Sequence, residues 1–99
     1  MVFTGLHIVE RDKLDKMKYQ VGFKPRSMKD LNKIPLELRR QIVKKIEEMG
    51  NDLAGDVKQL TNITPEYRLR VGDYRVLFEI EDGTIVVYRV RHRREAYRR

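Results

Sequence analysis

The last third of the chain alternates apolar and polar residues, which predicts three antiparallel strands joined by tight turns over residues 66–97. Asp82-Gly83, between two alternating stretches, is typical of a two-residue hairpin turn. Gly72-Asp73 predicts the other turn. Together the turns predict these cross-strand pairs: Val71 with Tyr74, Arg70 with Arg75, Ile80 with Ile85, Phe78 with Val87, and Leu77 with Tyr88.

Because side chains alternate across a sheet, this register assigns each residue to one of two faces. The apolar, core-facing set is Leu69, Val71, Tyr74, Val76, Phe78, Ile80, Ile85 and Val87. The opposite set is Arg68, Arg70, Arg75, Leu77, Tyr88, Val90 and His92. Like charges placed opposite each other, as predicted for Arg70 and Arg75, destabilise a pair of strands. The second face therefore indicates a binding site for a polyanion.

The chain before the meander predicts one strand and two helices. Residues 18–24, KYQVGFK, predict a strand with Tyr19, Val21 and Phe23 on one side. Pro25 opens a helical stretch, and Met28 and Leu31 are expected on its buried side.

The second predicted helix covers residues 36–49, after Pro35 restarts the chain. Its apolar residues recur at helical spacing and form one stripe, which is expected to be core: Leu38, Ile42, Ile46 and Met49. Gly50-Asn51 ends this helix. Residues 51–65 are predicted to be a connecting loop, with Val57 and Leu60 dipping into the core.

These elements predict a small α+β domain in the order strand, helix, helix and three antiparallel strands, followed by a short basic tail. The first strand is expected to return beside the last one, giving a mixed four-stranded sheet. Both helices would cover its apolar face and leave the cationic face open. Residues 1–17 show no sustained period and are predicted to be an N-terminal extension that the core of the domain, residues 18–99, does not need.

Composition narrows the class of partner. A chain of 99 residues supports one core, and its net charge of +7 with a pI near 9.9 favours an anionic partner such as nucleic acid or an acidic protein. It has no cysteine, and His7 and His92 are isolated, so we expect no disulfide, no metal and no other cofactor. No apolar run approaches the length of a membrane span or a signal peptide, so we expect the cytoplasm.

The cations change type along the chain. Every lysine lies at or before Lys58, and every cation after it is an arginine. Arginine presents a planar fork that matches phosphate and stacks on bases. The last third therefore has the character of a recognition surface.

At these residues the chain resembles the RelE/ParE toxin superfamily of bacterial and archaeal toxin–antitoxin systems, from about Tyr19 to Tyr97. The segments that carry the resemblance are YQVGFKPRSMKDLNKI, LRRQIVKKIEE, LAGDVKQL, YRLRVGDYRVLFEIEDGTIVVYRV and the ending HRREAY. The tyrosine-arginine pairs, the ending and the arginine face fit the RelE branch better than the ParE branch. The resemblance implies a ribosome-dependent endoribonuclease that cuts mRNA without a metal, by attack of the ribose 2′-hydroxyl on the adjacent phosphate.

The resemblance also implies roles for individual residues. Arg75 falls at the family's phosphate-holding arginine, and Arg93 at the arginine that serves the leaving group. Arg91 or Arg94 takes the place of Arg93 if the ending shifts by a residue, and these two, with Arg68, are candidates for phosphate binding. Tyr97 falls at the C-terminal tyrosine that stacks on or orients the substrate.

Arg68 and Arg70 fall where well-studied members carry lysines, which leaves the general base open because a guanidinium rarely gives up its proton. His92 is the one ordinary acid–base group expected on the arginine face, where cations would keep it neutral. A role as base and a merely structural role both fit it. Tyr88 fits base stacking or packing.

Three functions fit the sequence. The first is the ribosome-dependent ribonuclease, whose partners would be a cognate antitoxin, the ribosome and mRNA, with the free toxin a monomer. The second is a ParE-like toxin that inhibits DNA gyrase by binding, without RNA cleavage. The third is an inactive, basic RNA-binding relative.

Overall fold

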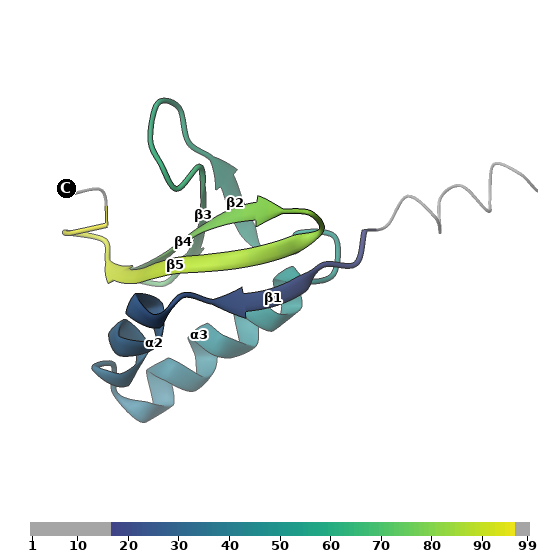
Figure 1. The fold of residues 1–99 in the computed structure, drawn as a ribbon. Coiled ribbons are helices and arrows are strands. Elements are labelled where there is room, and N and C mark those ends of the chain that lie inside the picture. The colour runs from purple at the N-terminus through teal and green to yellow at the C-terminus, as the bar shows by residue number, and fades with distance from the viewer. Residues whose placement is uncertain (1–16, 97–99) are drawn as a thin grey trace, which may run out of the picture.

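The computed structural model describes residues 17–96 and shows two helices packed on one face of a five-stranded sheet (Figure 1). Along the chain the elements are β1 (Gln20–Phe23), α2 (Pro25–Asn32), α3 (Leu36–Met49), β2 (Asp56–Gln59), β3 (Tyr67–Val71), β4 (Tyr74–Glu81) and β5 (Thr84–His92). The predicted extension, apart from Met17, and Tyr97 lie outside the described residues. The predicted α+β class and order of helices and strands are confirmed.

The sheet has the strand order β1-β5-β4-β3-β2. As predicted, β1 returns beside β5 in a parallel pair, and β3, β4 and β5 form an antiparallel meander. The predicted four strands were one too few. Residues 56–59, expected in a loop, form β2 on the far edge, antiparallel to β3. Its sequence, DVKQ, is too short and too polar to predict a strand, and it becomes one by pairing with β3.

Both helices follow the sequence pattern closely. Pro25 occupies the first turn of α2, where its missing N–H costs nothing. Gly50 ends α3, and a Cβ there would lie 3.0 Å from the Tyr19 carbonyl oxygen, so the helix end and β1 approach closely. Neither helix has the length and apolar character needed to cross a membrane.

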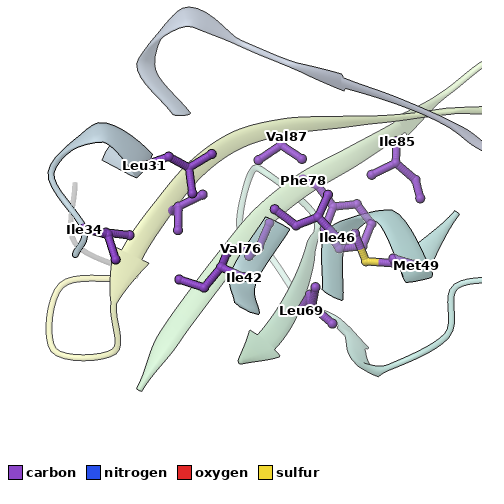
Figure 2. Packing of buried hydrophobic residues seen from close by; sticks show 11 residues of the cluster. Leu31, Ile34, Ile42, Ile46, Met49, Leu69, Val76, Phe78, Ile85 and Val87 are labelled. Carbon is purple, nitrogen blue, oxygen red and sulfur yellow. The ribbon is translucent and has the colours of Figure 1, made fainter. Parts of the chain in front are cut away.

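The core lies between the helices and the sheet, as Figure 2 shows. Ile42, Ile46 and Met49 of α3 are fully buried against the sheet, which confirms the predicted stripe. Leu31 of α2 is buried as predicted, whereas Met28 is 48% exposed and the expectation for it was wrong. The remaining members come mainly from the strands: Leu69, Val76, Phe78, Ile85, Val87 and Val90.

The register between β4 and β5 contains a β-bulge that the sequence analysis missed. Ile80 pairs with Ile85 and Phe78 with Val87 as predicted, but Leu77 pairs with Arg89 rather than Tyr88. Tyr88 is therefore an extra residue on β5, and the alternation shifts by one after it. This shift places Val90 in the core opposite Val76, so its assignment to the cationic face was wrong.

Candidate functional site

Three arginines form a row across neighbouring strands on the face of the sheet that the helices leave open. Arg70 of β3 pairs with Arg75 of β4, as predicted, and Arg75 pairs with Arg91 of β5. We call these residues the arginine row. Neighbouring strands lie about 4.8 Å apart, so the row spans roughly 10 Å. Three like charges at this spacing repel each other, and an anion with several oxygens would relieve the repulsion.

The turn between β3 and β4 sets the position of this row. Gly72 has φ +57°, a conformation that glycine adopts without strain, and it returns the chain directly into β4. Arg75 follows three residues later and its Nη1 donates to the carbonyl oxygens of Gly72 and Tyr74, at 3.0 Å and 3.1 Å. The turn therefore holds the Arg75 guanidinium through backbone carbonyl oxygens.

Arg75 lacks a carboxylate partner within the part of the chain that the structure describes. No carboxylate oxygen of residues 17–96 lies within ion-pairing distance of its guanidinium. Its neighbour in the row, Arg91, meets Glu95 at 3.6 Å, and that carboxylate is 59% exposed. Weak, solvated pairs of this kind contribute little and are readily exchanged for a phosphate.

Asp56 of β2 continues the row beyond Arg70 and balances part of its charge. Its carboxylate oxygens lie 3.1 Å from Nη1 of Arg68 and 2.8 Å from Nε of Arg70. The hydrogen bond from Arg68, and the charge of Arg70, hold the pKa of Asp56 below its usual value. Arg68 and Arg70 are thus oriented by one carboxylate. Sequence reasoning missed Asp56 because it did not recognise β2.

The first residues of the tail turn back toward the arginine row. The Arg93 amide donates to the Asp73 carbonyl oxygen at 2.7 Å, which places the start of the tail beside the β3–β4 turn. The Arg93 side chain is 62% exposed, and its Nε lies 3.9 Å from an Asp73 oxygen, at the limit of an ion pair. Arg94 is also exposed. Tyr97, the predicted stacking residue, lies outside the described residues.

His92 does not lie on the face of the arginine row, so that expectation was wrong. The bulge at Tyr88 pairs it with Tyr74, on the core-facing side, and the two rings meet edge to face with centroids 5.5 Å apart. Its Nδ1 accepts the Arg94 amide at 3.2 Å. Arg91 takes the place on the arginine face that the sequence analysis gave to His92.

Arg89 has a structural partner. Its Nε and Nη2 donate to the two carboxylate oxygens of Asp30 on α2, at 2.8 Å and 3.1 Å, and the Val90 amide donates to the same carboxylate at 2.9 Å. Burial alone would raise the pKa of Asp30, but these hydrogen bonds hold it below its usual value. We call this arrangement the Asp30–Arg89 clasp. It fastens α2 to the edge of β5 beyond the end of β1.

The opposite end of the same sheet face is acidic. Glu79 accepts the Glu66 amide at 2.7 Å, and Glu81 accepts the Tyr88 hydroxyl at 2.9 Å. Their position on alternate residues of β4, on the same side as Arg75, was readable from the sequence. The open face is therefore cationic at the Gly72 turn and anionic at the Gly83 turn, with buried Leu77 between them.

Three solved structures that this fold matches are toxin–antitoxin complexes. The fold matches the RelBE2 toxin–antitoxin complex of Mycobacterium tuberculosis with a TM-score of 0.68 and 27% identity, covering 77% of this chain and 99% of that one. The RelB–RelE complex of Methanococcus jannaschii gives 0.65 and 35% over 78% and 95% of the two chains. The RelE–RelB complex of Pyrococcus horikoshii gives 0.63 and 25% over 81% and 100%. The architecture is that of a small α+β toxin domain.

The chain belongs to the ParE toxin family of type II toxin–antitoxin systems, whose sequence model, described for the parDE system, matches residues 21–97. Within this superfamily it is RelE-like. It is 37% identical to Toxin RelE3 of Methanocaldococcus jannaschii over 83 residues, which cover 79% of this chain and 94% of that protein. It is 31% identical to Toxin RelG of Mycobacterium tuberculosis over 90 residues, 84% of this chain and all of that protein.

Proposed function

We propose that this RelE-like toxin is an endoribonuclease that cleaves mRNA on the ribosome and so inhibits translation. The observation that carries the proposal is the arginine row, with Arg75 at its centre held by backbone carbonyls and lacking a carboxylate partner within residues 17–96. A guanidinium that is oriented by the backbone and has no carboxylate partner within residues 17–96 can bind a phosphate. The relatives named Toxin RelE3 and Toxin RelG support the assignment.

The proposed reaction needs electrostatic stabilisation more than it needs a strong base. The ribose 2′-oxygen forms a bond to phosphorus and loses its proton, while the bond to the 5′-oxygen breaks and that oxygen gains a proton. The transition state is a dianionic phosphorane, which arginine forks stabilise by charge-assisted hydrogen bonds. Arg75 and Arg91 would bind the non-bridging oxygens, and Arg93, beside the same turn, would serve the 5′-oxygen.

Asp56 supports this arrangement by orienting Arg68 and Arg70, the two arginines that stand at the family's basic positions. With His92 on the core-facing side, the proposal uses no protein base within residues 17–96. The proton of the 2′-hydroxyl would pass to solvent or to ribosomal RNA. The reaction as proposed uses no metal.

We also propose a cognate antitoxin as partner, because the three solved relatives are toxin–antitoxin complexes. A net charge of +7 suits a partner with an acidic, amphipathic segment that folds on binding. The proposal places both proteins with the ribosomes, in the cytoplasm. Purification from the native host should yield the chain with a small acidic protein, and recovery of free monomer alone would contradict this.

Primer extension on cellular mRNA after induction tests the nuclease. The wild type should give new 5′ ends within coding regions under translation, and Arg75→Ala should reduce them about 100-fold or more. Arg40→Ala removes an equal charge from an exposed position on α3 and should leave cleavage unchanged. Induction of a DNA-damage response with intact mRNA would favour the gyrase-binding alternative instead.

A further inference from the structure

Tyr88, the extra residue at the β-bulge, lines a pocket between the start of α2 and the loop before β3. The bulge leaves Tyr88 without an opposite residue on β4. Its hydroxyl donates to Glu81 at 2.9 Å, which fixes the direction of the ring and raises the pKa of the phenol. The bulge therefore presents an oriented aromatic side chain on the open face of the sheet.

The pocket around this ring measures about 410 Å³, within the range of small-ligand sites. Pro65, from the loop before β3, and Pro25, from the start of α2, line it together with Tyr88, and Lys24, Arg26 and Arg89 complete it. Flat, rigid and mostly apolar walls of this kind suit a planar ligand.

Two cations of the pocket have no carboxylate partner within residues 17–96. Arg89 is held in the Asp30–Arg89 clasp, but no carboxylate lies within ion-pairing distance of Lys24 or Arg26. The Lys24 ammonium lies 5.2 Å above the centre of the Tyr88 ring, a cation–π contact that occupies the ring face. A flexible lysine stem lets this ammonium move aside when a planar group takes its place.

We propose that this pocket binds one nucleobase of single-stranded RNA, with the base stacked on Tyr88 and its neighbouring phosphates bound by Lys24 and Arg26. The inference rests on the proposed function and deepens it by adding a nucleotide subsite beside the arginine row. A nucleotide joins a planar aromatic group to an anion, which matches an aromatic floor with a cationic rim. An acidic peptide supplies the anion without the aromatic plane that would stack on Tyr88.

The pocket and the arginine row lie close enough for one short oligonucleotide to reach both. Tyr88 and Arg91 are three residues apart on β5, which corresponds to about 10 Å along a strand. The substrate strand would run from the arginine row toward β1, and the subsite would select how the RNA is placed relative to the bond that is cut.

Binding of an uncleavable oligonucleotide tests the subsite independently of catalysis. A short 2′-O-methyl RNA that carries 2-aminopurine is titrated with the purified full chain, while anisotropy and base fluorescence are recorded. The fluorescence should fall on binding, because 2-aminopurine is quenched when it stacks. Tyr88→Ala should abolish the quenching and weaken binding about tenfold, as expected for the loss of one base–aromatic stack.

Two matched pairs of variants separate base stacking by the Tyr88 ring from its hydrogen bond, and phosphate binding in the pocket from general charge. Tyr88→Phe keeps the ring but loses the hydrogen bond to Glu81, and it should retain quenching and affinity within about twofold. Lys24→Gln should lower the slope of log affinity against log salt by about 0.7, whereas Lys29→Gln, from an exposed position on α2 outside the pocket, should not.

The inference is overturned if folded Tyr88→Ala binds the RNA as tightly as the wild type, or if Tyr88→Phe loses as much as Tyr88→Ala. Binding of a poly-glutamate peptide that depends on Tyr88, without such dependence for RNA, would also overturn it in favour of a protein partner. If the wild type stacks the base on Tyr88 but cleaves no mRNA on ribosomes, the proposed function is wrong and this subsite stands.

Discussion

Two arginines on neighbouring strands of one sheet have opposite surroundings. Arg89 of β5 gives two hydrogen bonds to the carboxylate of Asp30, and both side chains are largely shielded, 23% and 13% exposed. Among residues 17–96, Arg75 of β4 bonds only to the carbonyl oxygens of its own turn, and it stands between two other arginines. One arginine is matched by an opposite charge and the other is surrounded by like charge.

The difference indicates which arginine stabilises the fold and which is kept for a ligand. A bidentate ion pair between a helix and a strand stabilises the fold, because removing one partner leaves the other charge poorly solvated and unpaired. A row of like charges lowers stability and is explained by the anion that it binds. The sequence shows both residues as arginines on the same segment and does not distinguish them.

The largest expected effect separates the two arginines by activity. Arg75→Ala should reduce growth inhibition and mRNA cleavage about 100-fold or more, because one charge-assisted contact to the transition state is lost. Its stability should be equal or higher by up to about 1 kcal/mol, since like-charge repulsion with Arg70 and Arg91 is relieved. Growth assays beside thermal unfolding measure both. Loss of activity through unfolding would show that Arg75 is structural.

The converse change breaks the Asp30–Arg89 clasp. Asp30→Ala removes the acceptor for Arg89 and for the Val90 amide, and it should lower the free energy of unfolding by about 2 kcal/mol. Below its melting temperature the variant should keep most of its cleavage rate, because Asp30 lies outside the arginine row. Denaturant unfolding measures the loss. A variant as stable as the wild type would contradict the structural role.

The dependence of stability on pH tests the same difference between the clasp and the arginine row. The pKa of Asp30 is below its usual value of 3.8 in the folded chain, so its stabilisation is present above that value and is lost as pH falls through the lowered folded pKa. Asp30→Asn should therefore flatten the fall in stability between about pH 5 and pH 2. Asp56→Asn serves as the comparison: its pKa shifts in the same direction, but the carboxylate is solvated and should change the profile less. Equal flattening by both variants would contradict the difference drawn between the two regions.

The smallest expected effect concerns His92. Because it lies opposite Tyr74 on the core-facing side, His92→Gln should change the cleavage rate by only about twofold, well below the 100-fold typical of a lost general base. Single-turnover cleavage at several pH values checks this. A loss of 100-fold or more with RNA binding retained would show that His92 reaches the substrate.

Much of the fold was predictable because local patterns and tertiary packing agree. The stripe of α3 and the turn at Gly72 that pairs Arg70 with Arg75 are determined by residue spacing alone. The strand β2 was missed because four mostly polar residues become a strand only by pairing with β3. Because β2 was not predicted, the orientation of Arg68 and Arg70 by Asp56 could not be predicted either.

The bulge had the widest consequences for the site. No glycine or proline marks residues 88–89 of β5, and the Asp30–Arg89 clasp that follows the bulge joins residues far apart in the chain. Because the bulge shifts the alternation of β5 by one residue, Arg91 and not His92 lies on the arginine face. The arginines on β3 and β4 were assigned correctly because they precede the bulge and depend only on the turn at Gly72.

The most direct test of the central claim is the single-turnover cleavage rate of a defined mRNA on programmed ribosomes, measured with folded wild type, Arg75→Ala and Asp30→Ala. We expect Arg75→Ala to cleave about 100-fold or more slowly while unfolding no more readily than the wild type. Asp30→Ala should cleave near the wild-type rate while unfolding more readily. Wild-type cleavage by Arg75→Ala, or no cleavage by the wild type itself, would contradict the assignment of the arginine row as a ribonuclease site.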